Sequence, residues 1–387
     1  MDERTEEGDL RVNAVRIEDL DVLRGLALFG VAVVNATTIF RVSLFLVLER
    51  FHTDPDPASH AVDWVVGLAL ESKAFAIFSL LFGVGLGIFR ERSGMPRLVR
   101  RLIVLLAVGL VHMLLVWNGD ILTAYALVGL SVLPFLGRKS ALWIALAIGA
   151  VYGLVPFPDI LPHGAEVTQH ALDANAAYGS GSWSTVLAFR TFETRRFIVP
   201  LLAETAPRIG ALFLLGDWAW RRGIFRAPAR HLRLLRATCM TGLLLGGGAT
   251  AVDAYYAWFG LPFGIFVRAA TAFANIPLAL GYAAGVLLLL QRPAWRRILT
   301  RFGPIGRMAL TSYLAQSLVF TALFYGGRLF GKLTSAESTV VAVAVYALQV
   351  VVSDRWLRRY HFGPFEWAWR ALTYGTLPPM RRLPSAK

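Results

Sequence analysis

The sequence predicts an all-α protein: a polytopic bundle of transmembrane helices with both termini in the cytoplasm. Three observations support this fold class. Hydrophobic residues make up 56% of the 387 residues, only 17% are charged, and the apolar residues occur in long runs that are almost free of charge. Soluble chains carry about 25% charged residues, and one membrane span needs roughly 20 apolar residues. A water-soluble core could not bury this much apolar surface, so we predict one membrane domain.

The apolar runs predict about ten spans. The second is expected to be long or broken, because Glu71, Ser72 and Lys73 interrupt it. The alternating glycines between Gly83 and Gly87 follow no strand, so they predict close helix packing and not a nucleotide-binding loop. The predicted spans are 22–42, 62–89, 101–117, 120–137, 141–157, 195–220, 237–259, 264–290, 307–327 and 337–353.

The segments outside these spans complete the predicted organisation. Residues 1–20 form a polar tail without the apolar core of a signal peptide, and we expect this tail in the cytoplasm. A single transmembrane domain covers 21–375. Within it, 355–375 is typical of an amphipathic helix at the cytoplasmic interface, anchored by tryptophans. The proline-containing residues 376–387 are expected to be disordered.

The net charge of +14 predicts the orientation of the spans. Arginine and lysine are concentrated in 90–101, 138–139, 221–236 and 291–301, which all fall on one side if the ten spans cross. By the positive-inside rule, that side is the cytoplasm. Such a charge on a soluble protein would suggest a nucleic-acid partner. Here we expect no nucleic acid, and predict contacts with the lipid bilayer and with anionic headgroups on the cytoplasmic side.

The longest segment on the opposite side is 158–194, which contains prolines, glycines and two histidines, His163 and His170. We expect a long extracytoplasmic loop, which is either a lid or substrate-binding element or a solvated connector. The single cysteine, Cys239, excludes an intrachain disulfide and a cysteine-based zinc cluster, and no metal is expected.

Ionisable residues inside apolar spans are the candidate functional residues, because placing them in a membrane is costly. The most specific group is His112 and Asp120, eight residues apart across a turn at Asn118 and Gly119. After this reversal Asp120 could face His112, fix its tautomer and raise its basicity, which would suit a general base. The alternative is a packing histidine beside a carboxylate that caps the next helix.

Two arginines near the expected cytoplasmic face are candidate phosphate ligands. Arg24 lies three residues after Asp21, so the two share a helix face. They form an ion pair at the membrane boundary, or Arg24 binds a phosphate of a cofactor or lipid. Arg307 precedes Tyr313 and Gln316, which are three residues apart and can line a cavity from one helix face.

Four more polar residues within or beside the spans are expected to line the substrate cavity, namely Asn35, Lys73, Asn118 and Glu204. Glu204 and Arg208 are four residues apart, which suits an ion pair that faces the bundle interior. If the chain is a transporter, Lys73, Glu204 and Arg208 would be the coupling residues.

These motifs resemble the YeiB-like bacterial membrane proteins, a family of unknown function, over nearly the whole chain. The resemblance implies a multi-pass protein of the bacterial plasma (inner) membrane. It rests on LDVLRGLALFGVAVVN (20–35), FAIFSLLFGVGL (75–86), RLIVLLAVGLVHMLLVWNGDILTAYALVGL (101–130), GRMALTSYLAQSLVFTALFY (306–325) and GPFEWAWRALTYG (363–375).

The first span is also similar to that of transmembrane acyltransferases, such as the heparan glucosaminide N-acetyltransferase type and the O-acetyltransferases of cell-surface sugars. This resemblance implies an acyl-CoA donor that enters from the cytoplasm, a sugar or lipid acceptor, and a buried catalytic histidine. The sugar O-acetylating proteins carry a histidine near the far end of the first span, where this chain has Asn35. Either His112 takes this role here, or no transfer chemistry remains.

The leading hypothesis is a membrane acyltransferase that moves an acyl group from acyl-CoA, its co-substrate, to a sugar, lipid or small-metabolite acceptor. His112 would deprotonate the acceptor and Asp120 would orient His112. Arg24 and Arg307 would hold the CoA phosphates, and Tyr313 and Gln316 would line the cavity and polarise the thioester carbonyl. Two alternatives stay open, a transporter or exporter of a small or lipid-linked metabolite and a non-catalytic membrane scaffold.

Overall fold

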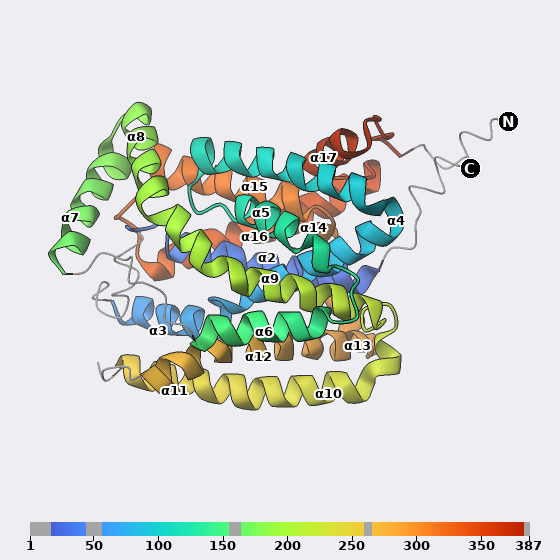
Figure 1. The fold of residues 1–387 in the computed structure, drawn as a ribbon. Coiled ribbons are helices and arrows are strands. Elements are labelled where there is room, and N and C mark those ends of the chain that lie inside the picture. The colour runs from blue at the N-terminus through green and yellow to red at the C-terminus, as the bar shows by residue number, and fades with distance from the viewer. Residues whose placement is uncertain (1–16, 44–55, 155–163, 259–264, 383–387) are drawn as a thin grey trace.

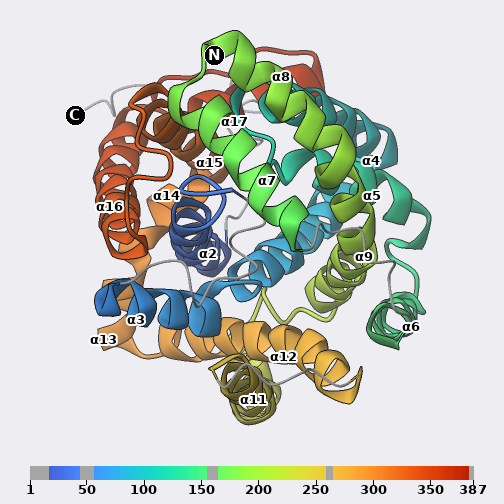
Figure 2. The same ribbon diagram turned by 90° about the vertical axis from the view of Figure 1, so that its left-hand side faces the viewer.

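The computed structural model describes residues 17–43, 56–154, 164–258 and 265–382. Every regular element in these ranges is helical, which confirms the predicted all-α class, and most helices lie side by side along one axis (Figure 1). Helix α2 (Glu18–Thr37) lies near the centre of the bundle in the end-on view (Figure 2). Most of its residues are buried, as expected for a helix that is surrounded by others.

The other helices follow in chain order, several of them joined by single turns of π-helix. They are α3 (Pro57–Val65), α4 (Lys73–Val111), α5 (Leu122–Val132), α6 (Ala141–Leu154), α7 (Ala165–Ala174), α8 (Trp183–Glu193), α9 (Val199–Arg221), α10 (Leu232–Thr241), α11 (Gly247–Trp258), α12 (Ile265–Leu290), α13 (Pro293–Leu299), α14 (Gly303–Arg307), α15 (Ala309–Phe320), α16 (Ser335–Arg359) and α17 (Pro364–Tyr374). The π-helical turns are η2 (Val66–Leu70), η3 (His112–Val116), η5 (Asn175–Ser180), η6 (Thr194–Ile198), η8 (Gly242–Gly246) and η10 (Thr321–Gly326).

The predicted interruption of the second span is confirmed. Ser72 has φ 62° and ψ −30°, which separates η2 from α4. Lys73 begins α4, and its Nζ donates to the carbonyl oxygen of Gly67 at 3.0 Å. A second break occurs at Gly94, with φ 77° and ψ 170°, where α4 turns and runs back along the bundle (Figure 1). The two segments of α4 correspond to the second and third predicted spans.

The glycine run of α4 packs closely against α9, as predicted. A Cβ atom on Gly83 would lie 2.2 Å from the carbonyl oxygen of Phe213, and one on Gly87 would lie 2.9 Å from the carboxylate of Asp217. Real side-chain atoms do not approach this closely, so only glycine allows the two backbones to meet here.

Several helices have the length and composition of membrane spans, which confirms the membrane character of the chain. The helical run Pro57–Val116 would measure about 90 Å if straight, about three times the thickness of a hydrocarbon core, so its division at Gly94 suits two crossings. The predicted count of ten spans stays a prediction. Within the described residues, four helices are long and apolar enough to cross a membrane: Glu18–Thr37, Pro57–Val116, Trp183–Arg221 and Ser335–Arg359. A fifth crossing is possible if Asn275–Leu290 and Pro293–Arg307, which are bent by 115° relative to each other, form one span.

The turns that carry the predicted cytoplasmic arginines lie at one end of the bundle, where α2 begins and α17 lies (Figure 1). Asp217, fully buried near the end of α9, joins three of these turns. Its Oδ2 accepts hydrogen bonds from the Gly137 amide at 2.8 Å and from Nε of Arg221 at 3.0 Å. Its Oδ1 lies 4.0 Å from a guanidinium nitrogen of Arg90. We call this end the basic end, and its assignment to the cytoplasm stays a prediction.

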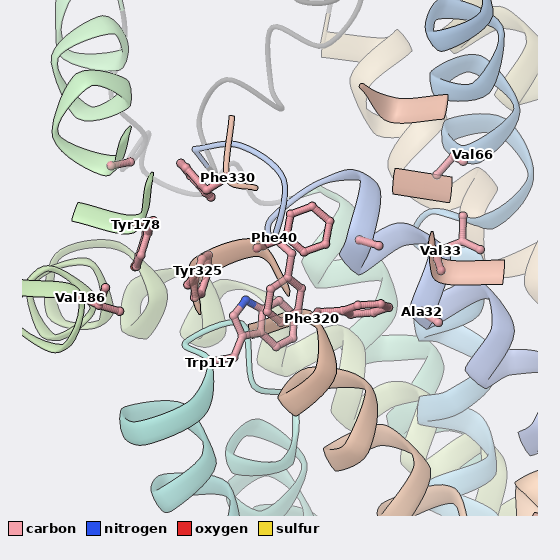
Figure 3. Packing of buried hydrophobic residues seen from close by; sticks show 14 residues of the cluster. Ala32, Val33, Phe40, Val66, Trp117, Tyr178, Val186, Phe320, Tyr325 and Phe330 are labelled. Carbon is pink, nitrogen blue, oxygen red and sulfur yellow. The ribbon is translucent and has the colours of Figure 1, made fainter. Parts of the chain in front are cut away.

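Aromatic rings fill the opposite end of the bundle (Figure 3). Phe40 stacks on Trp117 with ring centroids 4.4 Å apart, and Tyr178 stacks on Tyr325 at 4.6 Å. Phe330 packs against both tyrosines. Burying such large apolar surfaces contributes on the order of 2 kcal/mol per side chain. The cluster therefore fixes α7, α8 and η10 against α2.

The described part of the predicted loop 158–194 is helical rather than irregular. Helix α7 crosses the end of the bundle (Figure 2), and α8 continues through η6 into α9. Ser182 starts α8, because its hydroxyl accepts a hydrogen bond from the Thr185 amide at 3.3 Å. Gly164 precedes the first residue of α7 and Gly181 follows the last residue of η5, so these two glycines mark the ends of helical segments. His163 lies outside the described residues.

Two other predicted boundaries are corrected. Helix α2 begins at Glu18, inside the predicted tail 1–20, of which residues 1–16 lie outside the described ranges. The predicted interfacial helix 355–375 is divided, because Gly363 and Pro364 start a new helix after the end of α16. Within the predicted range, residues 355–359 thus belong to α16, and α17 is the separate helix.

The predicted disordered tail 376–387 is ordered as far as the structure describes it, to residue 382. The backbone of Tyr360 forms a bridge with that of Arg381, and the amide of His361 donates to the carbonyl of Met380 at 2.9 Å. The indole of Trp367 donates to the carbonyl of Pro378 at 2.8 Å. These backbone pairings hold the segment against α16 and α17.

Candidate functional site

A largely apolar cavity of about 220 Å³ runs from the basic end toward the middle of the bundle. Both segments of α4 contribute to its wall, together with α2, α5, α14, α15 and α17. Its lining residues are Arg24, Phe78, Leu81, Phe82, Gly85, Leu86, Leu98, Arg101, Leu102, Leu105, Ile121, Leu122, Tyr125, Gly306, Arg307, Ala309, Leu310, Tyr313, Glu366 and Trp369.

The structure brings the two predicted phosphate ligands, Arg24 and Arg307, to the same cavity. Glycines make this possible, because α2 and α14 are in backbone contact. A Cβ atom on Gly25 would lie 2.2 Å from the carbonyl oxygen of Phe302, and one on Gly306 would lie 1.8 Å from that of Asp21. The predicted pair with Asp21 also forms, with Nη1 of Arg24 3.3 Å from Oδ1. Arg24 therefore pairs with Asp21 and lines the cavity as well.

A third arginine, Arg101, lines the same cavity from the second segment of α4. Its guanidinium carbon lies 3.5 Å from the centroid of the Trp369 ring and 4.8 Å from that of Phe89. The Trp369 indole also donates to the Arg101 carbonyl at 2.9 Å. These contacts hold the cation in place by cation–π attraction. The predicted membrane anchor Trp369 thus packs against the cavity.

Helix α17 closes one side of the cavity through Glu366. Its Oε1 accepts hydrogen bonds from the amides of Leu310 and Thr311 at 2.7 and 3.0 Å, and its Oε2 accepts one from the Thr311 hydroxyl at 2.5 Å. A carboxylate at these first amides of α15 compensates the positive end of the helix dipole. Burial raises the pKa of this carboxyl, against the opposing effect of these hydrogen bonds.

The predicted pair His112 and Asp120 forms. The Nδ1 atom of His112 lies 2.9 Å from Oδ1 of Asp120, and both side chains are buried. The other carboxylate oxygen accepts from the amide and the hydroxyl of Thr123, at 2.7 and 2.8 Å. An aspartate accepts only, so Nδ1 carries the proton and Nε2 is the basic nitrogen. This Nε2 is buried and has no hydrogen-bond partner.

Tyr313 connects this pair to the cavity. Its ring lines the cavity, and its centroid lies 5.4 Å from that of His112. Its hydroxyl accepts a hydrogen bond from the Ile121 amide, directly after Asp120, at 3.3 Å. His112 itself is not part of the cavity wall. The histidine is therefore one side chain removed from the cavity that holds the three arginines.

A second buried polar cluster lies at the aromatic end, centred on Glu193 of α8. One of its oxygens accepts from the Asn118 amide at 2.8 Å and from the Tyr178 hydroxyl. The other lies 3.1 Å from Nε2 of His170, whose Nδ1 is 2.7 Å from the Ser43 hydroxyl. Burial, together with the adjacent Glu193 carboxylate, raises the pKa of Tyr178 well above its ordinary value. Asn118 thus belongs to this cluster and not to the cavity.

The remaining predicted cavity residues lie elsewhere. Asn35, Lys73 and Glu204 line neither site. Gln316 is buried, but its amide donates to Gln349 at 2.8 Å and does not line the cavity. The expected ion pair between Glu204 and Arg208 does not form in the described residues. The guanidinium of Arg208 lies instead 5.2 Å from the ring of Phe75.

Three residues of these sites, Arg101, Glu366 and Glu193, are not predicted from the sequence, and neither is the burial of Arg190, which precedes Glu193 on α8. Arg101 lies in a basic segment that predicts topology, and Glu366 lies in a stretch typical of an interfacial helix. Glu193 and Arg190 are in the segment that was expected to be a loop. A charged pair three residues apart, in a stretch 183–194 that has no other charge, was the available signal for a buried helix.

Comparisons with known proteins identify relatives along nearly the whole chain. It is 33% identical to the uncharacterized protein YxaH of Bacillus subtilis, over 95% of this chain and 96% of the relative. It is 31% identical to an uncharacterized 39.9 kDa protein of Bacillus acidopullulyticus, over 94% and 96%. It is 27% identical to the uncharacterized protein YeiB of Escherichia coli, over 93% and 97%. No solved structure matches the chain.

A family model described as a protein of unknown function (DUF418) matches residues 219–376. That region includes α14, α15 and α17, which supply Arg307, Tyr313 and Glu366 to the cavity. Together with the full-length relatives, this match shows that the chain belongs to the DUF418 family of YeiB-like proteins.

Proposed function

We propose that the protein is a membrane acyltransferase that takes an acyl group from acyl-CoA. One observation carries the proposal: the cavity that begins at three arginines ends at Tyr313, whose ring lies beside the His112–Asp120 pair. Phosphate binding, an apolar channel and a general base are the three elements that such a transfer needs. Three arginines and apolar side chains line the cavity here, and a buried histidine lies beside its Tyr313 wall, which supports the proposal.

The donor would lie along the cavity. Arg24, Arg101 and Arg307 would hold its phosphates, since guanidinium groups pair with phosphate oxygens in a planar, bidentate manner. The apolar walls suit a narrow chain such as the pantetheine arm and its acyl group. A volume of about 220 Å³ leaves the nucleotide at the mouth, on the basic end.

The chemistry would occur at the inner end of the cavity. Tyr313 separates His112 from the cavity, so its ring would have to shift before Nε2 of His112 takes the proton from an acceptor hydroxyl or amine that attacks the thioester carbonyl. The Tyr313 hydroxyl would donate to the developing oxyanion. As the carbon–sulfur bond breaks, the proton on His112 would pass to the leaving thiolate. Asp120 would stabilise the charged imidazole throughout.

Calorimetric titration of acetyl-CoA and longer acyl-CoAs into the detergent-purified protein tests the donor. Micromolar binding is expected, and Arg24→Ala or Arg101→Ala should weaken it at least tenfold. Arg358→Ala is the matched control, because Arg358 is exposed and pairs with Asp354 away from the cavity. If folded, monodisperse protein binds no acyl-CoA, the proposal is wrong.

A transporter is the second candidate, and the Glu193 cluster favours it. Buried polar groups lie toward both ends of the same bundle, separated by the His112–Tyr313 contact, as in a path between two membrane faces. Against it, Lys73 and Glu204 line neither site. Efflux from proteoliposomes without any acyl-CoA would favour transport over transfer.

A further inference from the structure

Arg190 of α8 is a buried cation without a polar partner. Its side chain is 1% exposed, and none of its three guanidinium nitrogens forms a hydrogen bond. No carboxylate of the described residues lies within ion-pair distance of it. Its neighbours are aromatic: the guanidinium carbon lies 5.5 Å from the Trp183 ring centroid and 5.8 Å from that of Tyr325. A guanidinium in this state has lost its hydration and gained only cation–π contacts in return.

The carboxylate nearest to Arg190 along the helix, that of Glu193, contacts other residues. Glu193 lies three residues after Arg190 on the same helix, but one of its oxygens accepts from Asn118 and Tyr178, and the other lies 3.1 Å from Nε2 of His170. The Glu193 carboxylate thus contacts an amide, a phenol and an imidazole, whereas the guanidinium of Arg190 has no hydrogen-bond partner. A fold that needed Arg190 only for stability would pair it with the carboxylate one turn away.

A second buried donor lies on the same helix face. The hydroxyl of Thr194, four residues after Arg190, is also buried and has no hydrogen-bond partner. Residues four apart on a helix are neighbours, so the hydroxyl and the guanidinium can reach one ligand. Orphan donors are normally satisfied in native proteins, and two adjacent ones indicate an absent acceptor.

We propose that Arg190 and Thr194 bind the oxyanion of a ligand, a carboxylate or a phosphate monoester, that enters from the end opposite the basic end. Such a group accepts two parallel hydrogen bonds from guanidinium and one from a hydroxyl. A cavity of about 10 Å³, which suits one water, is lined by Tyr178, Glu193 and Tyr325 among others, but not by Arg190 or Thr194. Ligand entry therefore requires the side chains packed around Arg190 to move apart. The proposal does not depend on acyl transfer.

Thermal unfolding of the detergent-purified protein tests this site. Methyl phosphate, acetate and short-chain phosphatidic acid are added separately at constant ionic strength. We expect at least one of them to raise the Tm of the wild type by several degrees. Arg190→Gln should abolish this rise and Thr194→Val should reduce it. Arg208→Gln is the matched control, because Arg208 lies on the same helical run and over an aromatic ring, but away from Glu193.

The ligand-free proteins provide an independent criterion. Arg190→Gln removes an unpaired buried charge, so its Tm without ligand should equal or exceed that of the wild type. A Tm well below those of the wild type and Arg208→Gln would show a structural role and overturn the proposal. A wild type that responds to none of the three probes, or an equal response in Arg190→Gln, would also overturn it. A response to phosphatidic acid alone identifies a lipid headgroup, and one to acetate alone identifies a carboxylate.

Discussion

Asp120 serves two partners with its two oxygens: Oδ1 lies 2.9 Å from Nδ1 of His112, and Oδ2 accepts the amide of Thr123. The first contact orients a candidate base, and the second caps the first turn of α5. The reversal that allows both depends on Gly119, because a Cβ atom there would lie 2.3 Å from the Trp117 indole. The carboxylate of Asp120 therefore contacts both the first turn of α5 and the candidate base at the end of the preceding helical segment.

Asp120→Asn separates these two roles. An asparagine oxygen can still accept the Thr123 amide, so the Tm should change little. The negative partner of His112 is lost, and acyl transfer should fall about 100-fold, within the range of general-base effects. The measurement is release of free CoA from acyl-CoA in the presence of an acceptor. Asp120→Ala should lower stability as well, by about 1 kcal/mol from the lost cap. Unchanged turnover in Asp120→Asn would remove His112 from the mechanism.

The pairing of His112 with Asp120 could be predicted because it is local. An Asn-Gly turn between two apolar runs fixes where the chain reverses, and eight residues then suffice to bring the two side chains together. The shared cavity of Arg24 and Arg307 was also expected, since both were placed near one membrane face. These predictions needed only helix periodicity and a topology.

Arg101 and Glu366 could not be predicted in the same way. Their roles depend on the packing of α17 against α4 and α15. Trp369 and Arg101, which form a hydrogen bond in this contact, are 268 residues apart in the sequence. Amphipathic composition is equally consistent with a helix that lies on lipid. Arg190 was missed because the prolines and glycines between 158 and 182 indicate turns, and nothing local shows that α8 is buried.

Asp217 is predicted to be a structural residue of the basic end. It is fully buried and binds the Gly137 amide, Arg221 and, more distantly, Arg90. Asp217→Asn keeps an acceptor for the amide but leaves the two cations without their counter-charge, which should cost about 3 kcal/mol. Denaturant unfolding in detergent measures the loss. Asp354→Asn, which breaks an exposed pair on α16, should change stability by far less.

Glu366 predicts a pH effect on stability with a definite sign. Burial raises the pKa of its carboxyl in the folded state, so the folded state favours the protonated form more than the unfolded chain does. Its contribution to stability is then complete below the ordinary pKa and is lost as the pH rises through the raised value. Glu366→Gln does not titrate. The Tm of this variant minus that of the wild type should therefore be larger at pH 8 than at pH 5. A difference that is constant or larger at pH 5 contradicts the raised pKa.

The contact between α4 and α9 predicts a sharp difference between two glycine substitutions. Gly83→Ala places a Cβ atom 2.2 Å from the Phe213 carbonyl, so the two backbones must separate along their contact. This should cost about 3 kcal/mol and displace the neighbouring Phe82, which lines the cavity. Gly149→Ala in α6 is the control, because its Cβ atom would meet nothing within 4 Å. It should stabilise α6 by up to about 1 kcal/mol through helix propensity. Denaturant unfolding of both variants measures the contrast, and equal stabilities would mean that α4 and α9 do not meet at Gly83.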